Sequence, residues 1–179
     1  MKTVFQCVLL LLAAQGPLNA LGQVSDAQLK VRGANCLYSL REPAGWTGDT
    51  QLAGDYYANI IFYKNRDEIR HGGAIIQVYS FDKKDENTEK DLAFDVKSYK
   101  DKYRKLKSRD VTVSHKDYKC YAKLVYVDND FYQYIVYLNP GPSYKTGISV
   151  AMNVGRREAN EEEMRAFRQL VSSLLMEQG

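Results

Sequence analysis

The sequence predicts an α+β fold, an α/β/α sandwich in which a central, mostly antiparallel sheet is covered by a helix on each face. The centre of this sheet is a predicted hairpin, Lys119–Val127 and Phe131–Leu138, joined by a short Asp/Asn turn. Both strands are apolar on both faces, with only Lys123 and Gln133 interrupting, so the hairpin needs cover on both sides. Two amphipathic segments, far apart in the chain, supply one helix for each side.

Residues 1–20 are predicted to be a secretory signal peptide. Lys2 provides the positive start, Val4–Ala14 the apolar run, and Ala20 the small residue that precedes cleavage. The apolar run is too short to span a bilayer, so we expect no integral membrane segment after cleavage. The mature protein is therefore expected to be exported.

Residues 21–35 are predicted to be an N-terminal lead-in with one short helical turn at Asp26–Lys30, and residues 36–177 to be a single domain. The lead-in has weak periodicity, whereas the domain contains segments rich in β-branched and aromatic residues. Besides the hairpin, the predicted strands are Cys36–Leu40, Tyr56–Lys64, Ala74–Phe81, Val111–Ser114 and Tyr144–Val154.

The two helices are predicted from their caps and apolar stripes, over residues 88–107 and 160–177. Thr88 begins the first, with Asp91 as an imperfect capping box, and its stripe is Leu92, Val96, Tyr99, Tyr103 and Leu106. Asn160 caps the second, with Glu163 in the reciprocal position of the box. The predicted buried stripe of this helix is Met164, Phe167, Leu170, Val171, Leu174 and Leu175.

The charge balance and the cysteines limit the classes of function. A net charge of +3 argues against a nucleic-acid partner, which is usually met by a strongly basic face. Cys36 and Cys120 remain after signal cleavage, and a disulfide between them would contribute about 4–5 kcal/mol in the chain-entropy model. Two buried free thiols are the alternative. Both alternatives stay open, because the Cα separation that a bridge requires is not visible in a sequence.

The order of elements resembles the Mog1/PsbP superfamily. The resemblance lies in the opening strand that runs into Pro43-x-Gly45-Trp46, in Ile148–Ala151, and in the closing helix Glu163–Leu175. That superfamily includes a photosystem II extrinsic subunit, a small-GTPase-binding nuclear protein and bacterial envelope proteins. The resemblance implies an α/β/α sandwich with a noncatalytic, partner-binding role. Together with the signal peptide it implies the bacterial periplasm or exterior.

No motif with recognisable chemistry occurs, so no cofactor or metal site is expected. The two histidines, His71 and His115, lie in unrelated segments, and zinc sites usually require three or four ligands. His71 near Asp67 and Glu68 suggests at most a loose metal contact. Ser114 beside His115 would need a third group and suitable geometry to form a nucleophilic triad.

The leading hypothesis is a noncatalytic protein-interaction module that binds another envelope protein, and hence not an enzyme. The first alternative is a carrier that holds a small molecule or metal between sheet and helix. A hydrolase that uses Ser114 and His115 is a weaker alternative. The sequence does not specify an oligomeric state.

Five residues are predicted as a contact surface, Lys100, Arg104, Lys107, Tyr132 and Tyr134. The basic end of the first helix suits an acidic partner, or simply a solvated face whose cations complement the helix C-terminus. The chain has 14 tyrosines, many on predicted strands, and tyrosine suits both sheet packing and recognition. An exposed face on which several tyrosines gather is therefore an expected contact site.

Overall fold

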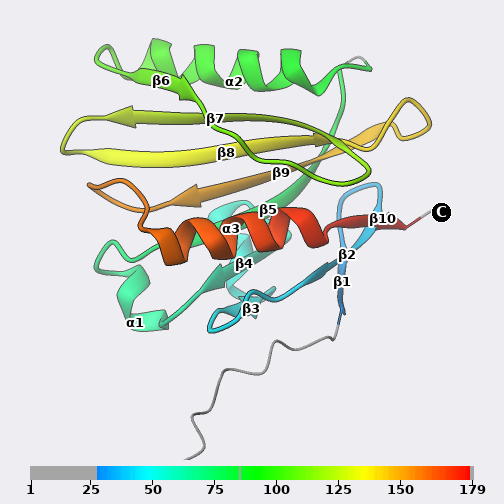
Figure 1. Ribbon diagram of the computed structural model, residues 1–179, viewed down its shortest axis with the longest axis horizontal. Coiled ribbons are helices and arrows are strands. Elements are labelled where there is room, and N and C mark those ends of the chain that lie inside the picture. The colour runs from blue at the N-terminus through cyan, green and yellow to red at the C-terminus, as the bar shows by residue number, and fades with distance from the viewer. Residues whose placement is uncertain (1–27, 85, 178–179) are drawn as a thin grey trace, which may run out of the picture.

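The computed structural model describes residues 28–84 and 86–177, and the predicted signal peptide lies outside this part of the chain. The described residues form a mixed α+β fold with ten strands in two antiparallel sheets, three α-helices and one 3-10 helix. Figure 1 shows how these elements are arranged. None of the described helices is long and apolar enough to cross a membrane.

The larger sheet has seven antiparallel strands around the predicted hairpin. Their order is β3 (Thr47–Asp49), β4 (Ile60–Tyr63), β5 (Ile75–Asp82), β9 (Thr146–Asn153), β8 (Phe131–Asn139), β7 (Lys119–Val127) and β6 (Lys107–Asp110). The hairpin prediction is confirmed, since β7 and β8 pair from Val127 and Phe131 back to Lys119 and Asn139. Asn129 in the connecting turn has φ 61°, a left-handed conformation that Asn tolerates.

Helices α2 (Thr88–Lys102) and α3 (Glu161–Ser173) pack against opposite faces of this sheet (Figure 1). The alternation of side chains along β8 separates the two faces. Ile135 and Tyr137 belong to a cluster with Leu92 and Val96 of α2. The intervening residues of β8 belong to the main core with α3, namely Tyr134, Val136 and Leu138 with Ala166, Phe167, Leu170 and Val171. Because both faces are covered, the hairpin has no polar side.

A second sheet of three strands, β1 (Gln28–Arg32), β2 (Leu37–Arg41) and β10 (Leu175–Glu177), lies at the end of α3 (Figure 1). Tyr38 and Leu40 of β2 are fully buried in the main core. Gln28–Arg32 pairs with β2 along its whole length. The helical turn predicted at Asp26–Lys30 is therefore wrong for residues 28–30, and part of the predicted lead-in belongs to the sheet.

The predicted end of the first helix also needs correction. Helix α2 ends at Lys102, and Tyr103 is already extended with φ −121°. Lys107–Asp110 forms β6, a strand of four polar residues that pairs with β7 and carries no apolar signal. The strand predicted at Val111–Ser114 is absent from this described segment, which continues without regular structure. The cap of α2 is Asn87 rather than Thr88, because the Asn87 side chain accepts from Glu89 N.

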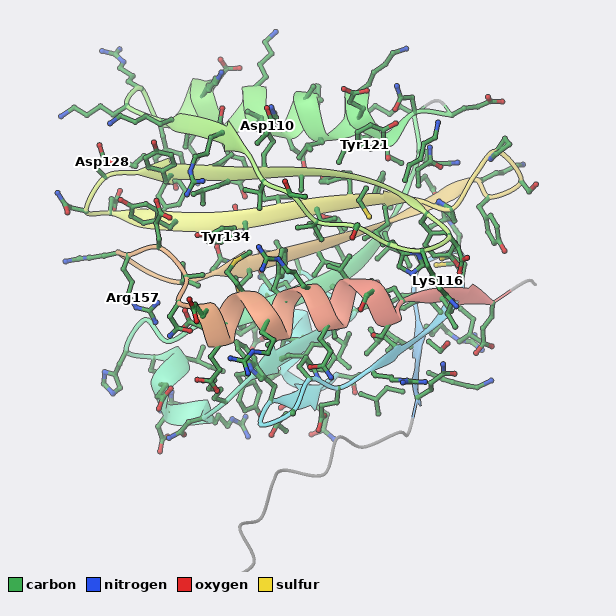
Figure 2. All side chains as sticks on the ribbon, viewed as in Figure 1. Asp110, Lys116, Tyr121, Asp128, Tyr134 and Arg157 are labelled. Carbon is green, nitrogen blue, oxygen red and sulfur yellow. The ribbon has the colours of Figure 1, made fainter. Side chains whose placement is uncertain are left out.

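The predicted capping box of α3 is confirmed. Asn160 Oδ1 accepts from Glu163 N at 2.9 Å, and Glu163 Oε2 accepts from Asn160 N at 2.9 Å. Arg157 donates to both carboxylate oxygens of Glu163 at 2.7 Å. Figure 2 shows Arg157 near the beginning of α3. Two charge-assisted bonds therefore fix the start of this helix against the preceding turn.

Two short helices flank β4. The 3-10 helix η1 (Leu52–Tyr56) precedes β4, so the predicted strand Tyr56–Lys64 is shortened to Ile60–Tyr63. Helix α1 (Arg66–Ile69) follows β4 and is capped by Asn65. Trp46 is 2% exposed and belongs to the main core.

Candidate functional site

The face of the large sheet that carries α2 is covered in two separate places. Helix α2 packs over β7 and β8, whereas η1 packs over β4. Their apolar contacts form two distinct clusters, one around Leu92 and Val96 and one around Ala53 and Ile61. Between the two covers lies a groove of ≈ 300 Å³. We call it the tyrosine groove, and it is lined by Tyr56, Tyr57, Gln77, Tyr79, Asp95, Tyr99, Gln133, Ile135 and Ala151.

The floor of the tyrosine groove is formed by adjacent rows of side chains that run across the strands of the sheet. Gln77, Ala151 and Ile135 pair in register across β5, β9 and β8. In the next row Tyr79 pairs with Ser149. The small side chain of Ala151 lies between two larger ones, which gives the groove its depth.

The walls come from two helices that belong to different parts of the chain. Asp95 and Tyr99 are four residues apart on α2 and so share one flank of that helix. On the other side, Tyr56 ends η1 and Tyr57 follows it. Tyr57 is 94% exposed and has φ 53°, a conformation that a tyrosine rarely adopts. An exposed aromatic ring is thus held at the rim of the groove by an unusual backbone geometry.

A relay of hydroxyl groups ends on the carboxylate of Asp95. Tyr137 donates a hydrogen bond to Asp95 Oδ2, and the hydroxyl oxygens of Tyr79 and Tyr137 are 3.2 Å apart. Since the Tyr137 proton is directed to Asp95, Tyr79 must be the donor to Tyr137. Burial, followed by the neighbouring Tyr79 and Asp95, raises the pKa of Tyr137. Tyr137 therefore stays a neutral donor that orients the carboxylate.

The side-chain amide of Gln77 is engaged within the protein. Gln77 Oε1 accepts from Asn153 Nδ2 at 2.7 Å, and Gln77 Nε2 donates to the Tyr56 carbonyl at 3.2 Å. Burial raises the pKa of Tyr99, and the neighbouring Gln133 amide opposes that rise. The bond from Gln77 fixes the Tyr56 side of the groove to the sheet.

The electrostatics of the tyrosine groove are one-sided. Among the described residues, Asp95 is the only charged one that lines the groove, and no Lys, Arg or His does so. Asp95 Oδ1 has no hydrogen-bond or ion-pair partner within residues 28–84 and 86–177. Over the same residues, no three His, Cys, Asp or Glu side chains gather as a set of metal ligands. The groove is thus suited to binding through ring faces and one carboxylate.

Two larger hollows, each of ≈ 1070 Å³, are less suited to a ligand. In the first, Lys83 Nζ already donates to Gly141 O at 2.8 Å, and Asn35 Nδ2 donates to Asp82. Burial lowers the pKa of this Lys83. The second lies between α3 and residues 112–114 and is lined mainly by exposed polar side chains. The polar groups of the first hollow hold its loops together, and those of the second face solvent.

The predicted contact residues do not form one surface. Lys100 and Arg104 are exposed at the end of α2 and just beyond it. Lys107 binds Asp128 at 2.5 Å, at the end of the sheet where Tyr132 stacks on Tyr126 on the α3 face. Tyr134, which is labelled in Figure 2, is 4% exposed because it packs on Phe167 of α3, so its prediction as a contact residue is corrected.

Cys36 and Cys120 are free thiols, the second of the alternatives that the sequence leaves open. Both are half-buried at the margin of the main core. Burial raises the pKa of Cys36 and raises that of Cys120 to about 11. Neither thiol is therefore a ready nucleophile near neutral pH.

Both ring nitrogens of His115 are engaged with the backbone. Nδ1 accepts from the amides of Asp117 and Tyr118 at 3.0 and 3.1 Å, and Nε2 lies 2.9 Å from Leu174 O. The two amide donors require an unprotonated Nδ1, so Nε2 carries the proton and donates. His115 is thus not positioned as a base for Ser114, which is exposed. His71 is exposed in the turn after α1.

Sequence reasoning missed most of the tyrosine groove, although part of it left a signal. It expected a contact site where exposed tyrosines gather, and four tyrosines line the groove. Gln77 and Gln133 interrupt otherwise apolar strands on the same face, which is the one trace of a polar floor. No sequence pattern marked Asp95 or Ala151 as residues of a site. Comparison with known proteins finds no family model that matches the chain and no curated protein similar to it.

Proposed function

We infer that this domain is an exported, noncatalytic binding module of the bacterial envelope, and that the tyrosine groove is its binding site. The observation that carries the proposal is the groove itself. It is a hollow of ≈ 300 Å³, and four tyrosines are among the residues that line it. That volume is at the lower end of the range for small-ligand sites, which are largely preformed and carry a few fixed polar groups. It suits one small chemical group, either a free molecule or a side chain that a partner presents.

Other features support parts of this proposal. The signal-like residues 1–20 support export to the periplasm or exterior. We also propose that the domain is related to the Mog1/PsbP superfamily. The order of the elements and the helices on opposite faces of an antiparallel sheet support this relationship. The engagement of His115 with the backbone argues against the hydrolase alternative that used it.

The groove is tested by nuclear magnetic resonance of the isotope-labelled mature protein with a chemically diverse set of small molecules. The side-chain amides of Gln77 and Gln133 are reporters inside the groove. The Asn139 amide, which donates to Glu86 O at 2.7 Å at the far end of β8, is the internal control. We expect several molecules to shift the two glutamine signals without shifting Asn139. If no molecule does so, the groove is not the binding site.

A further inference from the structure

We propose that the ligand group of the tyrosine groove is a methylated ammonium cation, held by the faces of the tyrosine rings and by the carboxylate of Asp95. The inference rests on the proposed binding function and specifies the chemical class of the ligand. Three observations carry it, namely the charge of the groove, its unpaired rings and the hydrogen bonds already made within it.

The charge of the groove selects a cation. Asp95 contributes a carboxylate whose Oδ2 is held by Tyr137 and whose Oδ1 is without a partner among the described residues. No cationic side chain from the part of the chain that the structure describes lines the groove to neutralise it. An anionic ligand would lie against this carboxylate in a partly desolvated site, which is unfavourable. A positively charged ligand would supply the missing counter-charge.

The tyrosine rings suit a cation that cannot donate many hydrogen bonds. The face of an aromatic ring is electronegative and attracts an ammonium group, and sets of such rings bind quaternary ammonium ligands. Tyr56, Tyr57 and Tyr99 stack on no other ring within the described residues, so their faces are not used for packing among aromatics. Tyr57 is in addition the most exposed large aromatic side chain described.

The hydrogen bonds within the groove disfavour a ligand read through many hydroxyl groups. Gln77 uses both its oxygen and its nitrogen within the protein, and Gln133 neighbours the Tyr99 hydroxyl. The Gln77 amide that would otherwise recognise a sugar hydroxyl is therefore engaged. The unused carboxylate oxygen and the ring faces remain, and a methylated ammonium group matches both.

A methylated ammonium group can belong either to a free small cation or to a methylated lysine side chain of a partner protein. The test titrates the mature protein with choline and with its neutral isostere, in which a quaternary carbon replaces the nitrogen. A short peptide that contains trimethyllysine is titrated in parallel. Binding is followed by calorimetry and by the Gln77 and Gln133 amide signals.

Three variants accompany these titrations. Tyr57→Ala removes an exposed ring, so it is expected to fold normally and to weaken choline binding roughly three- to thirtyfold. Asp95→Asn keeps an oxygen for the Tyr137 bond but removes the charge, and is expected to weaken binding at least about tenfold. Tyr132→Ala lies on the α3 face and is the matched control with unchanged binding.

The outcomes separate this inference from the proposed function. Choline binding that exceeds binding of the isostere, and that falls in both groove variants, supports the cation. Equal binding of choline and isostere in the groove overturns the cation but leaves the binding site standing. Absence of choline binding while other molecules shift Gln77 and Gln133 overturns it as well. A peptide that binds more tightly than choline identifies a partner's lysine as the source, and a weaker one identifies a free cation.

Discussion

The imidazole of His115 donates from Nε2 to the carbonyl oxygen of Leu174 over 2.9 Å, and this contact fastens the segment before β7 to the end of α3. In Figure 2, Lys116, the next residue, lies near that end of the helix. Leu174 O is one of the carbonyls that a helix end leaves without an intrahelical donor. His115 satisfies it from a segment with no regular structure.

This contact predicts that the protein loses stability as the pH falls below about 6.5. Burial lowers the pKa of His115, because the protonated imidazole would lose hydration, although the bond to Leu174 O raises it. Protonation would also end the acceptance by Nδ1 from two amides. The unfolded chain therefore binds a proton at higher pH than the folded one. The free energy of unfolding should fall with decreasing pH by up to about 1.4 kcal/mol per unit.

Urea unfolding at pH values of about 7.5 and about 5.5 measures this effect. His115→Asn should reduce the pH dependence and cost about 1–2 kcal/mol at the higher pH, since it removes the bond to Leu174. His71→Asn, at an exposed histidine, is the control and should keep the pH dependence of the natural chain. If the free energy of unfolding of His115→Asn keeps the same pH dependence, another group is responsible for it.

The carboxylate of Glu163 predicts a second stability change at lower pH. Although burial raises its pKa, the bonds from Arg157 and from Asn160 N lower it by more. The stabilisation that these bonds give is fully present above the pKa of Glu163 in the unfolded chain, near 4.5. It is lost as the pH falls through the lower pKa of Glu163 in the folded protein. Glu163→Gln should lower the free energy of unfolding by about 1–3 kcal/mol at neutral pH.

Thermal unfolding followed by circular dichroism provides the comparison. Glu161→Gln is the matched control, because Glu161 is exposed in the same first turn of α3. We expect that control to cost no more than about 0.5 kcal/mol. Equal effects of the two substitutions would mean that the capping box contributes little beyond the helix dipole.

The free thiols predict slow chemical modification in the native protein. Cys36 and Cys120 are half-buried and their pKa values are raised, so little thiolate is present at neutral pH. An aromatic disulfide reagent should react slowly with these two thiols in the folded protein and rapidly after denaturation. Peptide mapping without reduction should recover both residues as separate alkylated peptides. A cross-linked peptide that contains both would contradict the structure.

The backbone conformation of Tyr57 predicts that one substitution at this position has opposite effects on stability and on binding. Its left-handed backbone is unfavourable for a tyrosine, and glycine adopts it without penalty. Glycine also increases the entropy of the unfolded chain, which offsets part of the gain. Tyr57→Gly should therefore leave the free energy of unfolding unchanged or raise it by up to about 1 kcal/mol.

The same substitution should weaken binding in the groove, measured in the titrations described above. Tyr57→Ala keeps the left-handed strain and is the matched control, since it removes the ring alone. A clear loss of stability in Tyr57→Gly would show that the ring packs against the domain rather than serving the groove.

The hairpin and the start of α3 could be predicted because their signals are local. The Asp/Asn turn, the alternating apolar strands and the Asn160/Glu163 box each act within a few residues. The predicted end of this helix at residue 177 was wrong, since α3 ends at Ser173 and Leu175–Glu177 forms β10. The short strands could not be predicted, since β6 contains only polar residues and β10 pairs with a segment near the other end of the described chain. Their pairing depends on partners that no local window contains.

The tyrosine groove is harder still to predict, because it is a property of what the helices leave uncovered. Gln77, Asp95 and Gln133 come from three different elements, and only the register of β5, β9 and β8 brings the two glutamines to one face. The number of tyrosines is visible in the sequence, but their grouping depends on how η1 and the flank of α2 lie across the sheet.

The pairing of β10 with β2 has a consequence for how the protein is made. Lys30 and Glu177, whose side chains meet at 3.1 Å, are separated by 147 positions in the chain. Contacts of such long range form late, and a nascent chain folds as it emerges from the ribosome. The small sheet must therefore wait, with one edge of β2 open, until translation has released the residues of β10.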